Sequence, residues 1–164
     1  MEIVAQHLQH EAVVRTLSVE RDLFGRSAFN RYYYATFLEV KASLAKLRPQ
    51  WAGELAHASV PEVLRGKVKK ELSRGRNTAQ KMNDIAVVAL CQKALSATES
   101  LAKIMDEGRA TRVAADYHPE IPIVFVAVSD FRLNTVGVQT AQTWPHKARI
   151  LLVAISSAWK QVHA

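Results

Sequence analysis

The sequence predicts an all-α fold of four to five helices with a short β-hairpin inserted near residues 121–136. Apolar residues recur with the 3.6-residue period of helices over most of the chain. One stretch, residues 121–128, is rich in β-branched residues instead. The 164 residues, 49% of them apolar, suffice for one core but are short for two. We therefore expect a single domain over residues 1–164.

Two helices are predicted in the first third of the chain. Residues 7–24 show a loose helical rhythm, which Gly25 should end. Ser27 is a suitable N-cap for the next helix, residues 28–47, and Pro49 should end it. This helix holds an aromatic cluster: Phe29, Tyr32, Tyr33, Tyr34 and Phe37. Aromatic residues at helical spacing are usually buried.

The middle of the chain predicts two more helices. Residues 59–62, Ser-Val-Pro-Glu, match the capping box that begins a helix, and Gly75 should supply the left-handed position that ends it. Residues 77–107 hold the longest helical period. We expect Gly108 to weaken or kink that helix, and Pro119 to lie beyond its end.

The last third combines strands and a helix. Residues 129–130 are a turn signal after the β-branched stretch, and residues 131–134 can return as a partner strand. A two-stranded ribbon is marginal alone, so we expect it to lie against the helices. The final helix should run over residues 138–162, with a kink or a restart at Pro145.

Basic residues outnumber acidic ones. The chain has 22 Lys and Arg against 15 Asp and Glu, which gives a net charge of +7. Such a surplus favours a polyanionic partner. Seven basic residues lie within residues 61–81 and are candidate nucleic-acid contacts: Arg65, Lys67, Lys69, Lys70, Arg74, Arg76 and Lys81. A solvated helix face is the alternative, because charge runs are common.

Several function classes are disfavoured by what the sequence lacks. The single cysteine, Cys91, cannot form an internal disulfide, and no Cys pair is present to bind zinc. The sequence contains no glycine-rich phosphate loop and no HExxH or GxSxG motif. It also contains no run of about 18 apolar residues and no signal peptide pattern. We therefore expect a soluble, cytoplasmic protein that needs no metal, cofactor or membrane.

A tyrosine-rich motif lies in the second predicted helix. Residues 27–39 read Ser-Ala-Phe-Asn-Arg-Tyr-Tyr-Tyr-Ala-Thr-Phe-Leu-Glu. This resembles a helix of HEPN-superfamily proteins that reads roughly S-A-x-x-R-x-Y-Y-A-x-F-H. Residues 56–60 and 112–117 look like two further HEPN segments, the second of the form R-x-x-A-D-Y. Leu38 departs from the family, which often has His there, and residues 121–136 look like an addition.

The resemblance implies a dimeric helical bundle that cuts RNA without a metal, using an Arg and a His four to six residues apart. Arg112 and His118 fit, with five residues between them. Histidine titrates near neutrality and can take the proton of a ribose 2′-OH. A guanidinium can stabilise the charge on the phosphorane. The expected supporting residues are Asp116, Tyr117, Arg31, Tyr33 and Arg109.

The same residues allow a plain structural interpretation. Arg112 and Asp116 are four residues apart and can form an ordinary ion pair on a helix surface. His118 is then only a residue at a helix end.

Two functional hypotheses follow. The first is a homodimeric HEPN endoribonuclease that acts on RNA, such as a toxin or defence effector held in check by a cognate antitoxin. The alternative is a non-catalytic HEPN module that binds a partner protein or a nucleotide, as beside a nucleotidyltransferase. A DNA-binding protein is less favoured, because no convincing helix-turn-helix is present.

Overall fold

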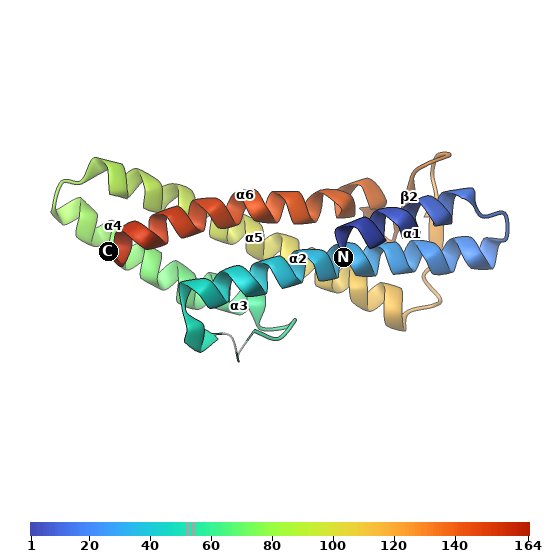
Figure 1. Ribbon diagram of the computed structural model, residues 1–164, viewed down its shortest axis with the longest axis horizontal. Helices are drawn as coiled ribbons and strands as arrows, with labels where there is room; N and C mark the ends of the chain where they lie inside the picture. The colour runs from blue at the N-terminus through green and yellow to red at the C-terminus, as the bar shows by residue number, and fades with distance from the viewer. Residues whose placement is uncertain (52, 54) are drawn as a thin grey trace. The chain divides into compact units, whose positions relative to one another are not determined.

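The structure is a computed structural model that describes residues 1–51, 53 and 55–164. Within these residues the chain forms five long helices and one small sheet (Figure 1). The first two helices are α1 (Glu2–Val14) and α2 (Ser18–Leu47). The third is a continuous run of α3 (Val60–Val63), the π-helical turn η2 (Leu64–Val68) and α4 (Lys69–Lys81). The last two are α5 (Ile85–Tyr117) and α6 (Val138–Val162). A 3₁₀ turn, η1 (Pro49–Trp51), follows α2, and the strands are β1 (Ile123–Phe125), β2 (Phe131–Leu133) and β3 (Val136–Gly137). The predicted all-α bundle with a short β insertion is confirmed.

The chain packs as two compact units. Unit 1 comprises Met1–Leu38 and Glu107–His146, and unit 2 comprises Glu39–Asp106 and Lys147–Ala164. The boundaries fall inside α2, α5 and α6, so each of these helices contributes one part to each unit. The expectation of a single domain over residues 1–164 stays a prediction.

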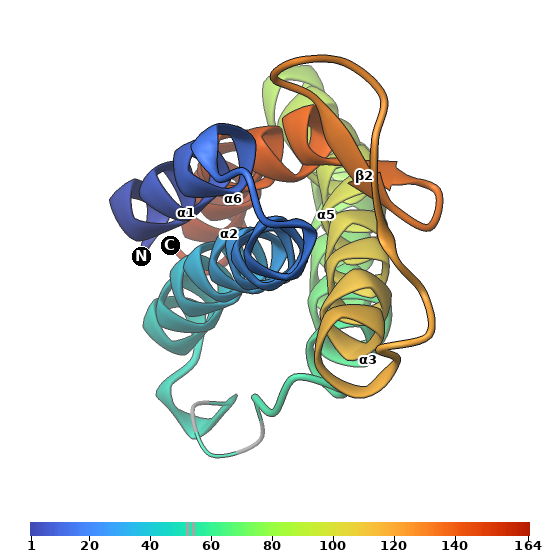
Figure 2. The same ribbon diagram turned by 90° about the vertical axis from the view of Figure 1, so that its right-hand side faces the viewer.

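Unit 1 is built around aromatic side chains of α2 and the strands. Phe29 of α2 meets Phe131 of β2 edge to face, with ring centroids 5.8 Å apart, and both residues are fully buried. β1 and β2 are antiparallel, with Ile123 opposite the buried Leu133. The chain turns again at Asn134, whose φ is 54°, and β3 then pairs with β2 (Figure 2). The predicted hairpin is therefore a three-stranded ribbon that packs on the helices.

Unit 2 has a separate apolar interior. Trp51 of η1 meets Trp159 of α6 at a centroid distance of 5.4 Å, nearly edge to face. Leu44, Leu64 and Leu72 of this unit are also fully buried. Residues 61–81, which contain the basic run of the sequence, therefore also place apolar side chains such as Leu64 and Leu72 in the interior of unit 2.

The predicted helix end at Gly25 and the predicted kink at Gly108 are wrong. Helices α2 and α5 run through both positions without a break. A Cβ at Gly25 would lie 3.2 Å from side-chain carbons of Ile123, and one at Gly108 would lie 2.8 Å from the ring of Tyr33. Both glycines therefore serve close packing between elements.

The predicted helix end at Gly75 is also wrong, because α4 continues to Lys81. A Cβ at Gly75 would overlap the side chain of Val162 in α6. The real end comes at Asn83, which has a φ of 57°, and Asp84 caps α5 by accepting the Val87 N–H at 3.0 Å. The single helix predicted over residues 77–107 is therefore divided between α4 and α5.

Other predicted boundaries differ in detail. The helix expected over residues 7–24 is interrupted between α1 and α2, at residues 15–17. Helix α3 begins next to Ser59 as predicted, but the Ser59 hydroxyl bonds the carbonyl of Ala56 and does not cap the helix. Pro145 lies inside α6, which continues to Val162.

Helix α5 is long and apolar enough to cross a membrane by length and composition alone. Its most apolar window has a mean hydropathy of 1.3, and 33% of that window is buried. The sequence predicts no membrane-spanning segment from uninterrupted apolar runs, because polar residues are scattered through this helix. A core helix of a soluble protein meets the same criteria. The fold is compatible with a soluble protein, in which α5 contributes Cys91, Leu101 and Met105 to the interior.

Candidate functional site

Arg112 lies near the end of α5, in unit 1, with 23% of its side chain exposed. Its Nε is 2.9 Å from Oδ2 of Asp116, and its guanidinium carbon is 5.2 Å from the ring centre of Tyr117. Burial lowers the pKa of Arg112, but Asp116 and the Tyr117 hydroxyl raise it more, so the net shift is upward. Arg112 is therefore a permanent cation, and the i, i+4 ion pair with Asp116 is formed.

Asn30 of α2 completes this cluster, and the sequence interpretation missed it. Its side-chain amide donates to Oδ1 of Asp116, so Asp116 is held from two helices. The buried Oδ1 of Asn30 and the buried Nε of Arg112 have no aligned hydrogen bond among the described residues. The cluster thus keeps one acceptor and one donor unsatisfied, although its charges are paired.

Tyr33 is a core residue whose pKa is affected by the charges of two arginines. It is 1% exposed and stacks on Phe37, with ring centroids 6.2 Å apart. Burial raises the pKa of Tyr33 to about 12, against the opposing effect of Arg109 and Arg112. Tyr33 therefore stays neutral over the physiological range. Arg109 and Arg31, the other predicted supporting residues, are exposed.

His118 follows the last residue of α5, and 47% of its side chain is exposed. Its Nδ1 lies 2.8 Å from Oε1 of Glu120. The backbone amide of Glu120 and the His118 side chain hold the pKa of the Glu120 carboxyl below its ordinary value. Because an ionised carboxylate can only accept, Nδ1 carries a proton in this contact. In the neutral imidazole, Nε2 is then the basic atom.

The backbone around His118 is fixed from α2 by Arg26, which is buried. Its Nη1 donates to the carbonyls of Ala114, Ala115 and His118, at 3.2 to 3.3 Å, and its Nη2 donates to that of Pro119 at 3.3 Å. These include carbonyls that a helix end leaves without intrahelical partners.

Asp22 completes this anchor. It pairs with Nε of Arg26 and also accepts the N–H of Ile123 at 3.0 Å. We call Asp22 and Arg26 the α2 anchor. Sequence reasoning missed it, because an Asp and an Arg four residues apart indicate only a local ion pair.

The structure joins some of the predicted catalytic residues and keeps others apart. Arg112, Asp116 and Tyr117 contact one another, whereas His118 is paired with Glu120. Within the described part of the chain, no contact joins the side chains of Arg112 and His118.

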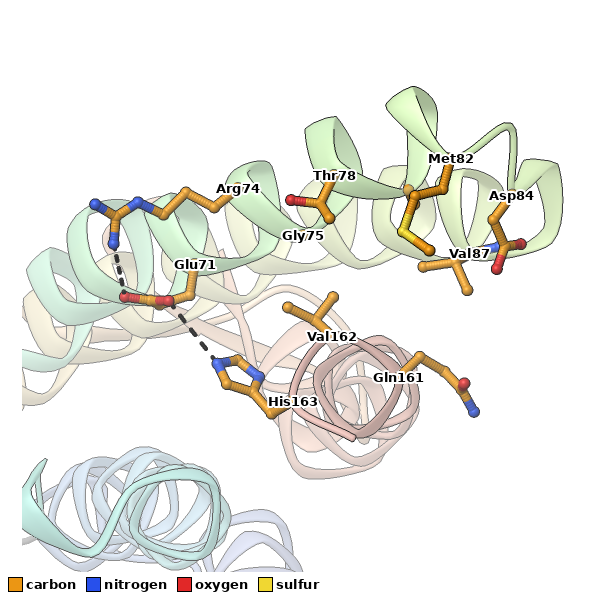
Figure 3. Close-up of a pocket in the computed structure, with 11 residues that line it drawn as sticks. Glu71, Arg74, Gly75, Thr78, Met82, Asp84, Val87, Gln161, Val162 and His163 are labelled. Atoms are coloured by element: carbon orange, nitrogen blue, oxygen red, sulfur yellow. Dashed lines mark hydrogen bonds and ion pairs between the residues drawn. The ribbon is translucent and has the colours of Figure 1, made fainter.

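The predicted nucleic-acid contacts lie in unit 2, where Arg65 and Arg74 are engaged with acids. Arg65 is 3.2 Å from Glu99 and 2.6 Å from Asp106. Arg74 is 3.6 Å from Glu71, and Figure 3 shows this carboxylate between Arg74 and His163. These guanidiniums are therefore partly neutralised.

The lysines of the same run are exposed: Lys67, Lys69, Lys70 and Lys81. Lys70, Arg74 and Lys81 are spaced i, i+4 and i+11, which places them in one row along the helix. Arg76 is half-buried, and its charge acts on the thiol of Cys91.

The charge surplus is confined to one unit. Unit 2 contains 15 Lys and Arg against 7 Asp and Glu, whereas unit 1 contains 7 against 8. The groups suited to acid–base chemistry therefore belong to a nearly neutral unit, and the groups suited to binding a polyanion belong to a strongly basic one.

Compared with protein-family models, curated proteins and solved structures, the chain has no significant match. The resemblance to HEPN proteins therefore rests on the sequence motifs alone.

Proposed function

We propose that the protein is a metal-independent endoribonuclease of the HEPN type. The observation that carries the proposal is the pairing of the exposed His118 with the ionised Glu120, close in sequence to a permanently charged Arg112. A carboxylate on Nδ1 orients the ring and leaves Nε2 as the base, an arrangement that suits general-base catalysis.

The proposed reaction uses each group at a stated atom. Nε2 of His118 takes the proton of a ribose 2′-OH, and the 2′-oxygen attacks the adjacent phosphorus. The bond to the 5′-oxygen breaks, and that oxygen takes a proton from water. The products are a 2′,3′-cyclic phosphate and a 5′-hydroxyl. Arg112 stabilises the negative charge of the phosphorane, with Asp116 orienting the guanidinium.

We also propose that the enzyme works as a cytoplasmic homodimer. The resemblance to HEPN proteins supports a dimer, and a second protomer can complete the site, because the side chains of Arg112 and His118 do not contact each other within the described part of the chain. A toxin restrained by a cognate antitoxin is the biological role that fits a ribonuclease of this type.

Cleavage of RNA in the presence of EDTA tests the proposal. We expect 2′,3′-cyclic phosphate ends, and a loss of about 100-fold or more in rate for His118→Ala and Arg112→Ala. Glu120→Gln should reduce the rate less, because it removes the negative charge beside the ring but leaves the base and an oxygen that can accept from Nδ1. His146→Ala, which changes another exposed histidine of unit 1, is the matched control. Undiminished cleavage by the first two variants overturns the site.

A non-catalytic HEPN module that binds a partner protein or a nucleotide is the second candidate. The Arg112–Asp116 ion pair and the exposed Leu38, where the family often has His, favour it. If this candidate is correct, purified protein degrades no RNA even at high concentration, and it co-purifies with a stable partner.

A further inference from the structure

An open groove runs along α5 and α6 within unit 2. Two adjoining cavities of about 510 and 350 Å³ form it, and they share Ser100, Ile150 and Leu151. Small side chains such as Ala97 and Ala154 line its middle. The lining of α5 extends from Leu90 to Ile104, a span of roughly 21 Å at 1.5 Å per residue.

Apolar side chains in this groove remain in water. Ile150 is 57% exposed and Val153 is 66% exposed, both on α6, and Leu90 of α5 is also exposed. Exposed apolar side chains that share one groove are typical of a binding surface.

The charged groups along the groove are all basic. Lys93, Lys103 and Lys147 line it, and none of the three has an ion pair among the described residues. Glu99 and Asp106, the nearest acids on α5, are engaged with Arg65 instead. An occupant must therefore bring negative charge together with apolar surface.

We propose that this groove binds an acidic amphipathic helix of a partner protein. A helix about four turns long matches the length of the groove, with apolar residues at i, i+3 or i+4 and i+7 against Ile150 and Val153. Asp or Glu beside this stripe pairs with the three lysines. The groove belongs to unit 2 and uses no residue of the proposed catalytic site, so this inference goes beyond the proposed function and does not depend on it.

The charges also argue against two other occupants. A symmetric dimer through this groove would bring the same three lysines of both copies together, and like charges repel. An anionic membrane satisfies the lysines, but a flat bilayer surface does not fill a groove.

The test uses synthetic helical peptides and the intact chain. A panel of amphipathic peptides about 18 residues long carries Leu at the spacing above, with Glu beside the stripe. The control panel carries Lys in place of Glu. We expect the Glu peptides to bind in fluorescence anisotropy, more weakly as salt rises, and the Lys peptides not to bind. Failure of every Glu peptide to bind at millimolar concentration overturns the proposal, as does equal binding of both panels.

Two pairs of variants locate the binding. Ile150→Ser should weaken binding about tenfold, whereas Val128→Ser, which changes an 89% exposed residue of unit 1, should not. Lys103→Glu should weaken binding similarly, whereas Lys46→Glu, an exposed lysine outside the groove, should not. Equal affinity in each pair overturns the proposal.

The alternative occupants have their own outcomes. If Ile150→Ser dissociates a homodimer in sedimentation, the groove is a contact between copies of this chain. If the same variant abolishes co-sedimentation with phosphatidylserine vesicles, the groove binds a membrane. Either result overturns the proposal of a partner helix.

Discussion

Gly75 and Gly66 lie in the same continuous helix of unit 2 but have different surroundings. A Cβ at Gly75 would overlap Val162, whereas a Cβ at Gly66 would meet nothing within 4 Å. Glycine lowers helix stability by roughly 0.5 to 1 kcal/mol relative to alanine, and of these two positions only at Gly75 does close packing against another helix offset this cost.

Alanine at these two glycines should have opposite effects on stability. Gly75→Ala should lower the free energy of unfolding by about 1 to 2 kcal/mol, because α4 and α6 must move apart or Val162 must shift. Gly66→Ala should leave it unchanged or raise it slightly. Urea denaturation measures both. Equal stability of the two variants would show that Gly75 is not a close-packing position.

The His118–Glu120 pair makes stability depend on pH in a definite direction. The pKa of Glu120 is lowered in the folded protein, so its contribution is present above the ordinary value of 4.5 and is lost as the pH falls through the folded value. We expect the difference in unfolding free energy between the wild type and Glu120→Gln to shrink on acidification from about pH 6 to about pH 3. Chemical denaturation at several pH values measures it. A difference that grows on acidification contradicts the assignment.

Among the elements, the end of α5 depends on a residue far away in the sequence. Arg26 donates to carbonyls that follow it by 88 to 93 residues. A buried guanidinium with several acceptors replaces the water that would otherwise solvate a helix end. The position of His118 is therefore set by α2 as much as by α5, the helix that it follows.

Removal of this anchor should loosen one segment and lower stability. Arg26→Met takes the guanidinium donor away from the Ala115 and Pro119 carbonyls and takes the cation away from Asp22, at a cost of about 3 kcal/mol. Amide hydrogen exchange should increase over residues 114–123 more than over α1. Arg132→Met, an exposed arginine of β2, is the matched control. Unchanged protection over residues 114–123 would contradict the role of the anchor.

The elements also show which features the sequence predicts and which it does not. The period of apolar residues correctly indicated the helical regions, and the β-branched run correctly indicated strands. Glycine was misread, because Gly25, Gly75 and Gly108 fit a helix end equally well until their neighbours are known. The turn at Asn83 and Asp84 carried a usable signal, since Asn tolerates positive φ and Asp caps helices.

The contacts of the candidate site also divide into those that the sequence predicts and those that it does not. The Arg112–Asp116 pair follows from helical spacing, and the plain structural interpretation of the sequence predicts it. The contacts of Asn30 and Arg26 join residues 86 or more positions apart, and no local pattern reveals them. Glu120 lies only two residues from His118, but the chain has left the helix there, so periodicity did not apply.

For the whole molecule, the division of charge separates the residues proposed for catalysis from most of the basic residues. The proposed chemistry belongs to unit 1, while unit 2 holds 15 basic against 7 acidic residues. Phosphate contacts give affinity without sequence preference and release counterions, so binding that depends on them weakens steeply with salt.

Lys70 and Lys81, which have no ion pair among the described residues, should contribute more to RNA binding than an arginine that is already paired. Replacing Lys70 and Lys81 by Ala should weaken binding of single-stranded RNA and reduce the slope of log K against log salt by about 1.4. Arg65→Ala should change the slope by less than about 0.7, the value for one lysine, because Glu99 and Asp106 already neutralise this guanidinium. Anisotropy titrations at several salt concentrations measure the slopes. An equal or larger effect of Arg65→Ala contradicts this ranking.

The chain crosses between the two units inside three helices, and this restricts how the protein can be dissected. No single cut yields an intact half, because each unit consists of two separate stretches of sequence. An autonomous version of unit 1 needs a new loop that connects Leu38 to Glu107. It also needs new capping residues where α2, α5 and α6 are cut short. Limited proteolysis between the helices should therefore give nicked but associated fragments before it gives separable ones.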